Sequence, residues 1–187
     1  MKNWKKKIGM FLTSQAISLF GSSLVQYAII WYITLQTGSG IMMTIATLCA
    51  FIPQVLISLF AGVWADRYNK KMIIILADSS IAVATLLIAI SFALGYDALW
   101  LLFAVLAIRS LGSGVQTPTT TSFIPEIVPE DQLMRVNGVN TTIQSVMLIV
   151  SPAVSGALLA SVELQYIFLI DVITAIIGIS IFSFVKV

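Results

Sequence analysis

Long apolar stretches alternate with short polar segments along the whole chain. Each stretch holds enough residues to form the helix of about 20 residues that crosses the hydrocarbon core of a bilayer. The segments between them are short, so neighbouring helices must run antiparallel. The pattern therefore predicts an all-α membrane protein with six transmembrane helices. The predicted spans are Ile8–Leu35, Ile41–Val63, Met72–Leu94, Leu99–Ile124, Val136–Leu159 and Gln165–Val185.

The longest link, residues 125–135, carries a helix signal of its own. Pro129 is followed by Glu130 and Asp131. Proline fits the first turn of a helix, and acidic side chains suit the positive end of the helix dipole. We expect a short helix that lies at the membrane surface and leads into the fifth span. An irregular loop is the alternative.

Composition agrees with an integral membrane protein. Hydrophobic residues make up 59% of the chain and charged residues 10%, whereas a soluble domain has about 25% charged residues. The chain has no histidine and a single cysteine, Cys49, which excludes the usual His/Cys metal sites and an internal disulfide. We expect no cofactor and no nucleic-acid partner, because the basic residues flank the spans and form no patch.

Lysine and arginine lie on one side of the predicted membrane, with the exception of Arg109 inside the fourth span. Basic residues beside spans mark the cytoplasmic side. We therefore expect a multi-pass protein of the plasma membrane with both termini in the cytoplasm. The basic residues on this side are Lys2, Lys5, Lys6, Lys7, Arg67, Lys70, Lys71, Arg135 and Lys186.

Polar side chains at helical spacing mark the first, second, fourth and fifth spans. In lipid such side chains must face other helices or water. The interiors of the third and sixth spans carry no amide, so we expect these two helices to support a cavity that the other four border. The expected cavity-lining residues are Gln15, Ser22, Gln26, Gln54, Gln116 and Gln144. The stripe of the second span runs through Thr44, Thr47, Gln54 and Ser58, and that of the fifth through Asn137, Thr141, Gln144, Ser151 and Ser155.

Three charges lie inside the spans: Arg109, Asp78 and Asp171. An arginine near the bilayer centre costs about 2.5–3.5 kcal/mol on insertion scales, so a partner must offset this cost. By depth, Asp78 lies in the cytoplasmic third of the membrane and Asp171 in the outer third. One interpretation is a structural ion pair that only fixes helix packing. The other is a charge whose neighbours change during transport, or that tunes a proton-carrying acid.

A short internal similarity indicates a repeat. Leu19–Gln26 in the first span and Ser110–Gln116 in the fourth share a Gly-Ser step followed by a glutamine. Inverted repeats of three helices are a known plan of transporters. We therefore expect a 3+3 inverted repeat.

The link between the second and third spans reads Gly62-Val63-Trp64-Ala65-Asp66-Arg67-Tyr68-Asn69-Lys70-Lys71. It resembles the signature loop of the major facilitator superfamily, Gly-x-x-x-Asp-Arg followed two residues later by two basic residues. By this resemblance, a gate at the cytoplasmic side would consist of Gly62, Asp66, Arg67, Lys70 and Lys71.

Two further motifs extend the resemblance. The segment Arg109–Gly114 is similar to the family's span-four signature, with its glycines one place early. The segment Ser151–Gly156 is similar to the antiporter signature Gly-Pro-x-x-Gly-Gly, with serine in place of two glycines. Residues that match this antiporter-like motif are Gly138, Ser151, Pro152, Ser155 and Gly156.

Along its whole length the chain is similar to the N-terminal half of macrolide-efflux (Mef-like) transporters. The resemblance implies a single six-helix bundle over residues 1–187, half of a major facilitator fold, with the second half absent from this chain. It implies proton-driven efflux of drugs such as macrolides or other amphiphiles, and no enzyme activity. The expected partners are the bilayer, a small amphiphilic substrate, the proton, and a second six-helix half or another copy of the chain. The alternative is a truncated or pairing structural subunit without transport activity.

Other membrane classes fit less well. An intramembrane serine protease needs a base such as histidine, and the chain has none. An aquaporin-like channel would show Asn-Pro-Ala loops, and the sequence contains no Asn-Pro. An ABC exporter domain has long cytoplasmic helices, whereas these links are short.

Overall fold

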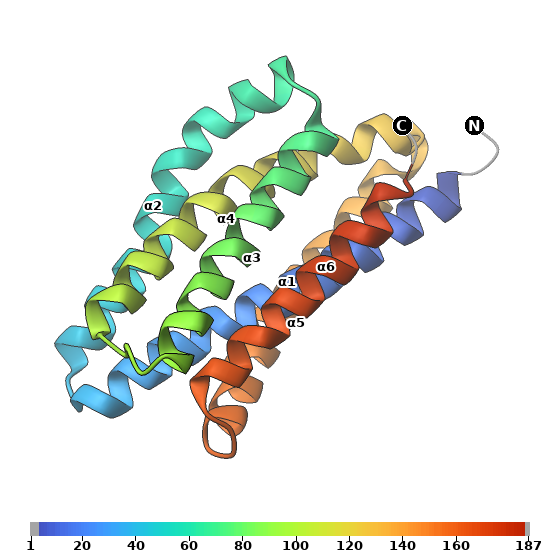
Figure 1. Ribbon diagram of the computed structural model, residues 1–187. Coiled ribbons are helices and arrows are strands. Elements are labelled where there is room, and N and C mark those ends of the chain that lie inside the picture. The colour runs from blue at the N-terminus through green and yellow to red at the C-terminus, as the bar shows by residue number, and fades with distance from the viewer. Residues whose placement is uncertain (1–3, 186–187) are drawn as a thin grey trace.

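The computed structural model describes residues 4–185 and consists of helices joined by short links (Figure 1). All six α-helices in this range are long and apolar enough to cross a membrane, so the chain is a multi-pass membrane protein. Their boundaries lie within a few residues of the predicted spans. The elements are α1 (Trp4–Thr37), α2 (Gly40–Arg67), α3 (Lys70–Ala93), α4 (Leu99–Ile127), η1 (Glu130–Gln132), α5 (Leu133–Leu159) and α6 (Leu164–Ser183).

The expected short helix before the fifth span is present only as a single 3-10 turn. α4 continues through Pro125 to Ile127, and the acidic residues after Pro129 form only the single 3-10 turn η1, which runs directly into α5. The link holds too few residues outside α4 and α5 for an independent α-helix, which needs several turns to be stable. Pro129 does stand at the start of the turn, with Glu130 and Asp131 in it.

The turn between α2 and α3 is only two residues long, Tyr68 and Asn69. The side chain of Asn69 accepts a hydrogen bond from the backbone N–H of Met72 at 3.2 Å and so caps the N-terminus of α3. The other end of α2 is capped in the same way by Ser39. The cap at Asn69 thus fixes the signature loop as a tight corner between two spans.

The helices pack as two similar groups of three. α4 packs against α2 and α3, α1 packs against α5 and α6, and α3 meets α6 to join the groups (Figure 1). Exchanging α1 with α4, α2 with α5 and α3 with α6 leaves this pattern unchanged, as a 3+3 repeat requires. The ends of α1 and α6 that carry Trp4 and Ser183 lie at the same end of the bundle as the α2–α3 turn.

Two glycines at equivalent places let the repeats pack closely. A Cβ atom on Gly21 would overlap the side chain of Thr174 in α6, and one on Gly112 would overlap Ile81 in α3. Glycine therefore allows α1 to approach α6, and α4 to approach α3, at the same point of each repeat.

A buried polar layer lies between two apolar clusters. The cluster near the helix ends with Trp4 and Ser183 contains a triangle of Phe11, Phe123 and Phe182, whose ring centroids lie 5.0 to 5.4 Å apart. The other cluster fills the opposite end of the bundle and includes Leu24 and Phe168. The buried polar residues between them belong to the candidate site.

Candidate functional site

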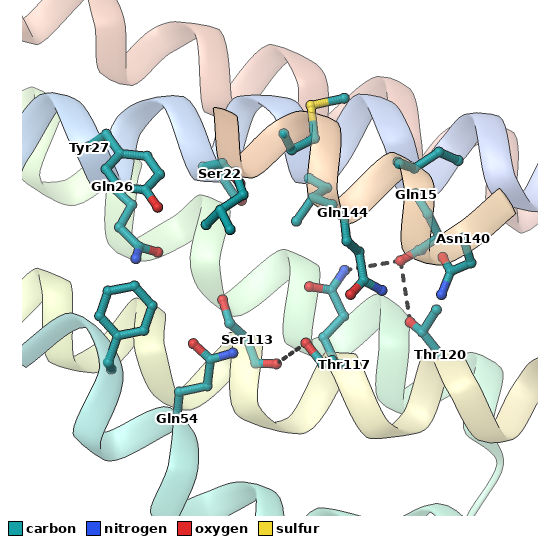
Figure 2. A pocket seen from close by; sticks show the side chains of 17 residues that line it. Gln15, Ser22, Gln26, Tyr27, Gln54, Ser113, Thr117, Thr120, Asn140 and Gln144 are labelled. Carbon is teal, nitrogen blue, oxygen red and sulfur yellow. Dashed lines mark hydrogen bonds between the residues drawn. The ribbon is translucent and has the colours of Figure 1, made fainter. Parts of the chain in front are cut away.

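One pocket of about 240 Å³ opens between α1, α2, α4 and α5 (Figure 2). No residue of α3 or α6 lines it. The structure places all six residues expected to line a cavity on its wall. They are Gln15, Ser22 and Gln26 on α1, Gln54 on α2, Gln116 on α4 and Gln144 on α5.

The pocket also contains residues that the polar stripes did not include. Asn140 of α5 lines it, whereas Asn137 and Thr141 do not. Both sets stand at helical spacing from Gln144, so the sequence alone did not separate the two faces of α5. On α2 only Gln54 of the expected stripe reaches the pocket. The hydroxyls of Thr44, Thr47 and Ser58 donate to backbone carbonyls of their own helix instead.

A close contact between α2 and α4 positions Gln54. The backbone N–H of Gln54 donates to the hydroxyl of Ser110 in α4 at 2.9 Å. A Cβ on Gly114 would overlap the backbone of Gln54, so this glycine is what lets α2 come so near. Pro53 precedes Gln54 inside α2 and disturbs the regular helix hydrogen bonds there, which Ser110 partly replaces.

The amides of α1 and α4 meet inside the pocket. The Oε1 atom of Gln15 accepts hydrogen bonds from the hydroxyl of Thr120 at 3.3 Å and from the Nε2 atom of Gln116 at 3.5 Å (Figure 2). Gln116 Nε2 also donates to Oδ1 of Asp78 at 2.7 Å. A chain of polar contacts thus runs from the pocket wall into the interior of the bundle.

Arg109 forms a buried ion pair with Asp171, so the structure selects the acid of α6 as its partner. The side chain of Arg109 is 4% exposed and that of Asp171 is 0% exposed. Arg109 also donates to the carbonyl oxygen of Ser22 at 3.0 Å and to the hydroxyl of Thr85. The hydroxyls of Thr85 and Ser22 donate to Asp171 at 2.7 and 2.9 Å. The cluster ties α1, α3, α4 and α6 together.

Asp78 of α3 is buried separately from this pair. Its Oδ1 atom accepts hydrogen bonds from Ser18 of α1 at 2.8 Å and from Gln116 at 2.7 Å. Within residues 4–185 it forms no ion pair. Depth in the membrane left both acids open as partners of Arg109, and only the observed side-chain contact with Asp171 distinguishes them.

The two lysines of the signature loop bind helix ends of the same bundle. Lys70 pairs with Glu126 of α4 at 2.6 Å. Lys71 donates to the carbonyl oxygens of Ser183 and Val185 at 2.9 and 2.7 Å, where the negative end of α6 favours a cation.

Asp66 and Arg67 are exposed in the last turn of α2. Neither forms an ion pair with any described residue. Gly62 lies one turn earlier on the same helix, with open space around its Cα. The loop thus has one pair of charges bound within the bundle and one pair turned outward.

The antiporter-like motif faces α1 over part of its length. Ser151 and Ser155 are fully buried, and a Cβ on Gly156 would lie 3.7 Å from Trp31 of α1. Pro152 stands inside α5. Gly138 is exposed, with no neighbour near its Cα.

Apart from Arg109, the basic residues of the described chain gather at one end of the bundle. They stand at the start of α1, at the turn between α2 and α3, and at the start of α5. Antiparallel packing brings these helix ends to the same side (Figure 1). Lys2 and Lys186, which were counted on this side, lie outside the described residues.

Comparisons with known proteins agree with the geometry. A sequence model of the Major Facilitator Superfamily matches residues 11–187. Macrolide efflux protein A of Streptococcus pyogenes is 39% identical over 177 residues, which are 94% of this chain and 44% of that protein. Macrolide efflux protein A of Enterococcus faecalis is 37% identical over 142 residues, 75% of this chain and 43% of that protein.

A more distant relative is the multidrug efflux pump Tap of Mycobacterium bovis. It is 29% identical over 159 residues, which are 82% of this chain and 37% of that protein. The chain therefore spans less than half the length of these relatives.

Proposed function

The chain belongs to the Major Facilitator Superfamily, and on this premise we propose that it forms one half of a drug-exporting secondary transporter. The family comprises transporters, not enzymes, and the chain is related to macrolide efflux proteins. The proposed activity is proton-driven efflux of macrolides or other small amphiphilic compounds. A second six-helix half, or another copy of the chain, would complete the transporter.

The observation that carries this proposal is the size and position of the pocket. Drug-sized ligands occupy sites of about 300–1,000 Å³ and are mostly enclosed. The pocket holds about 240 Å³ and has walls only from α1, α2, α4 and α5. Such a pocket supplies part of a drug site, and a second set of helices would supply the rest.

The chemistry of the wall suits an amphiphilic compound. The glutamines and Asn140 provide both donors and acceptors of hydrogen bonds. Tyr27, Phe51 and Met147 add aromatic and flexible apolar surface beside them. No charged side chain of the described residues lines the pocket. A compound with an apolar body and several hydroxyl or carbonyl groups matches this wall.

We assign the signature loop a role in gating. Lys70 and Lys71 hold α3 against the ends of α4 and α6, which makes this corner of the bundle rigid. Asp66 and Arg67 remain free to bind a partner outside these six helices. A contact that forms in one conformation and breaks in the other would favour the first, which is how a gate acts.

We assign the end of the bundle that carries the basic residues to the cytoplasm. The support is the positive-inside rule, which depends on lysine and arginine in short links. Both termini would then be cytoplasmic, and Gln36–Gly40, Gly95–Ala98 and Ala160–Leu164 would face outward.

Co-expression with the C-terminal six helices of a macrolide-efflux relative tests the proposal. The host should be a bacterium without its own macrolide exporters, and the readout is the accumulation of a radiolabelled macrolide. We expect the pair to lower accumulation relative to either half alone, and a protonophore to remove the effect. Gln54→Leu should weaken efflux, whereas Thr44→Val, on the same helix but outside the pocket, should not.

Unchanged accumulation by two halves that insert and co-purify would contradict the proposal. It would favour the alternative, a structural subunit that pairs without transport. Equal effects of Gln54→Leu and Thr44→Val on efflux would show that the pocket wall has no specific role in transport.

A further inference from the structure

Asp78 and Asp171 differ in the hydrogen bonds of their two carboxylate oxygens. In Asp171, Oδ1 accepts from Ser22, and Oδ2 accepts from Thr85 and Arg109. In Asp78, both hydrogen bonds end on Oδ1. Among the described residues none donates to Oδ2 of Asp78. One oxygen of this carboxylate is therefore open to a proton, while those of Asp171 are both in use.

No cation among residues 4–185 pairs with Asp78. It lies where α3 packs among α1, α4 and α6. Arg109 is paired with Asp171, and Lys70 and Lys71 are bound at the end of α3. The titratable groups of these helices are Lys5, Lys6, Lys7, Tyr27 and Tyr32 on α1, Lys70 and Lys71 on α3, Arg109 and Glu126 on α4, and Tyr166 and Asp171 on α6.

An unpaired ionised carboxylate is expensive to bury, and a neutral carboxylic acid is less so. Ser18 and Gln116 stabilise the ionised form by donating to Oδ1. Both can also donate to the carbonyl oxygen of the neutral acid, because protonation of Oδ2 leaves Oδ1 as an acceptor. The surroundings of Asp78 therefore accommodate either protonation state without repacking.

Gln116 connects this carboxylate to the pocket. Its side chain lines the pocket, and its Nε2 atom contacts both Asp78 and Gln15. A rotation of the Gln116 amide would open Asp78 to water in the pocket. A compound bound in the pocket would contact the same amide.

We propose that Asp78 is the residue that binds the coupling proton, which it exchanges with pocket water past the side chain of Gln116. This inference rests on the proposed function as a proton-driven exporter. In the uptake step, hydronium transfers a proton to Oδ2, an O–H bond forms, and water is released. In the release step, water takes the proton back and the carboxylate ionises. The ion pair of Arg109 and Asp171 holds the bundle together and takes no part in this exchange.

Infrared difference spectroscopy of the chain in lipid nanodiscs tests the site without any need for transport. A pH titration should show a carboxylic-acid C=O band that disappears as the pH rises. Asp78→Asn should remove the band, whereas Asp97→Asn, in an exposed link, should leave it unchanged. Asp78→Glu should shift its frequency, which keeps the assignment testable if the asparagine variant folds poorly. Gln116→Leu should move the midpoint of the titration.

A wild-type chain without a titrating band would overturn the proposal. So would a band that persists in Asp78→Asn, or a midpoint that Gln116→Leu does not move. In the transporter completed by a second half, Asp78→Asn should make any residual efflux independent of the pH gradient. Efflux that still follows the gradient would also overturn it. If the completed wild-type protein exports no macrolide, the proposed function fails while the titration result stands.

Discussion

Asp171 and Asp78 stand at corresponding places in the two repeats, yet their surroundings differ in kind. Asp171 of α6 contacts Arg109 of α4, and Asp78 of α3 contacts Ser18 of α1. Arg109 lies three residues before Gly112, where α4 packs against α3. Ser18 lies three residues before Gly21, where α1 packs against α6. The same scaffold position thus carries a closed ion pair in one repeat and an uncompensated acid in the other.

This difference indicates a division of roles. A buried ion pair is costly to break, because removing one partner leaves the other charge buried without a counter-charge. Such a pair suits a permanent structural contact between helices. An acid with neutral partners and one free oxygen can change its charge, which suits a proton site. The repeat therefore keeps its geometry while its chemistry diverges.

The largest effect should follow from breaking the ion pair. Asp171→Asn leaves Arg109 buried without a counter-charge, and we expect a loss of about 3–5 kcal/mol in the free energy of unfolding. Asp78→Asn removes no ion pair and should cost clearly less. Reversible unfolding in mixed detergent micelles measures both. Equal losses in the free energy of unfolding for the two variants would contradict the distinction between a structural ion pair and a proton-binding acid.

The next effect concerns the two glycines. A Cβ on Gly21 would press on the backbone of Asp171 as well as on Thr174, whereas at Gly112 it would meet only the side chains of Ile81 and Ser80. Gly21→Ala should therefore cost about 1–3 kcal/mol, typical of overpacking, and Gly112→Ala less. Gly138→Ala is the control, because nothing surrounds that position. The same unfolding assay would show the reverse order if α4 and α3 were the tighter pair.

The spans themselves follow directly from apolar length, so their number and approximate bounds could be predicted. The partner of Arg109 could not be predicted. The depth of Arg109 in the membrane allowed a contact with either Asp78 or Asp171, and only the tertiary structure shows which of them it contacts. The face of α5 was misread because Asn137, Thr141 and Asn140 all have helical spacing from Gln144. The short helix before the fifth span is only one 3-10 turn long, which could not be predicted because a helix start signal does not show how many residues remain before the next span begins.

An exposed acid should behave differently from both buried ones. Asp66→Asn should change the free energy of unfolding by no more than about 0.5 kcal/mol, as for other surface positions. In the completed transporter it should impair macrolide efflux, since the proposed gate loses a charge. Efflux at the wild-type level by a well-inserted variant would reduce the loop to a signal for topology.

The smallest perturbation is the introduction of single cysteines at two helix ends. Their labelling shows which membrane surface lies nearer to Asp78. Single cysteines at Ser39 and Lys70, in a Cys49→Ala background, should leave the fold intact. An impermeant maleimide applied to intact cells should label the first, and the second only after the cells are opened. The reverse pattern would place Asp78 nearer the outside and Asp171 nearer the cytoplasm, and would reject the proposed orientation.

The central claim is that the pocket is one wall of a transport path that other helices complete. Cysteine cross-linking in membranes tests it most directly, with Gln54→Cys and Gln144→Cys in the Cys49→Ala background. Leu76→Cys on α3 and Ile176→Cys on α6, both exposed, serve as controls on the opposite helices.

We predict cross-links from the two pocket positions to a second bundle, either the co-expressed half or another copy of the chain, and none from the controls. A stable monomer whose pocket cysteines cross-link to nothing would contradict the account.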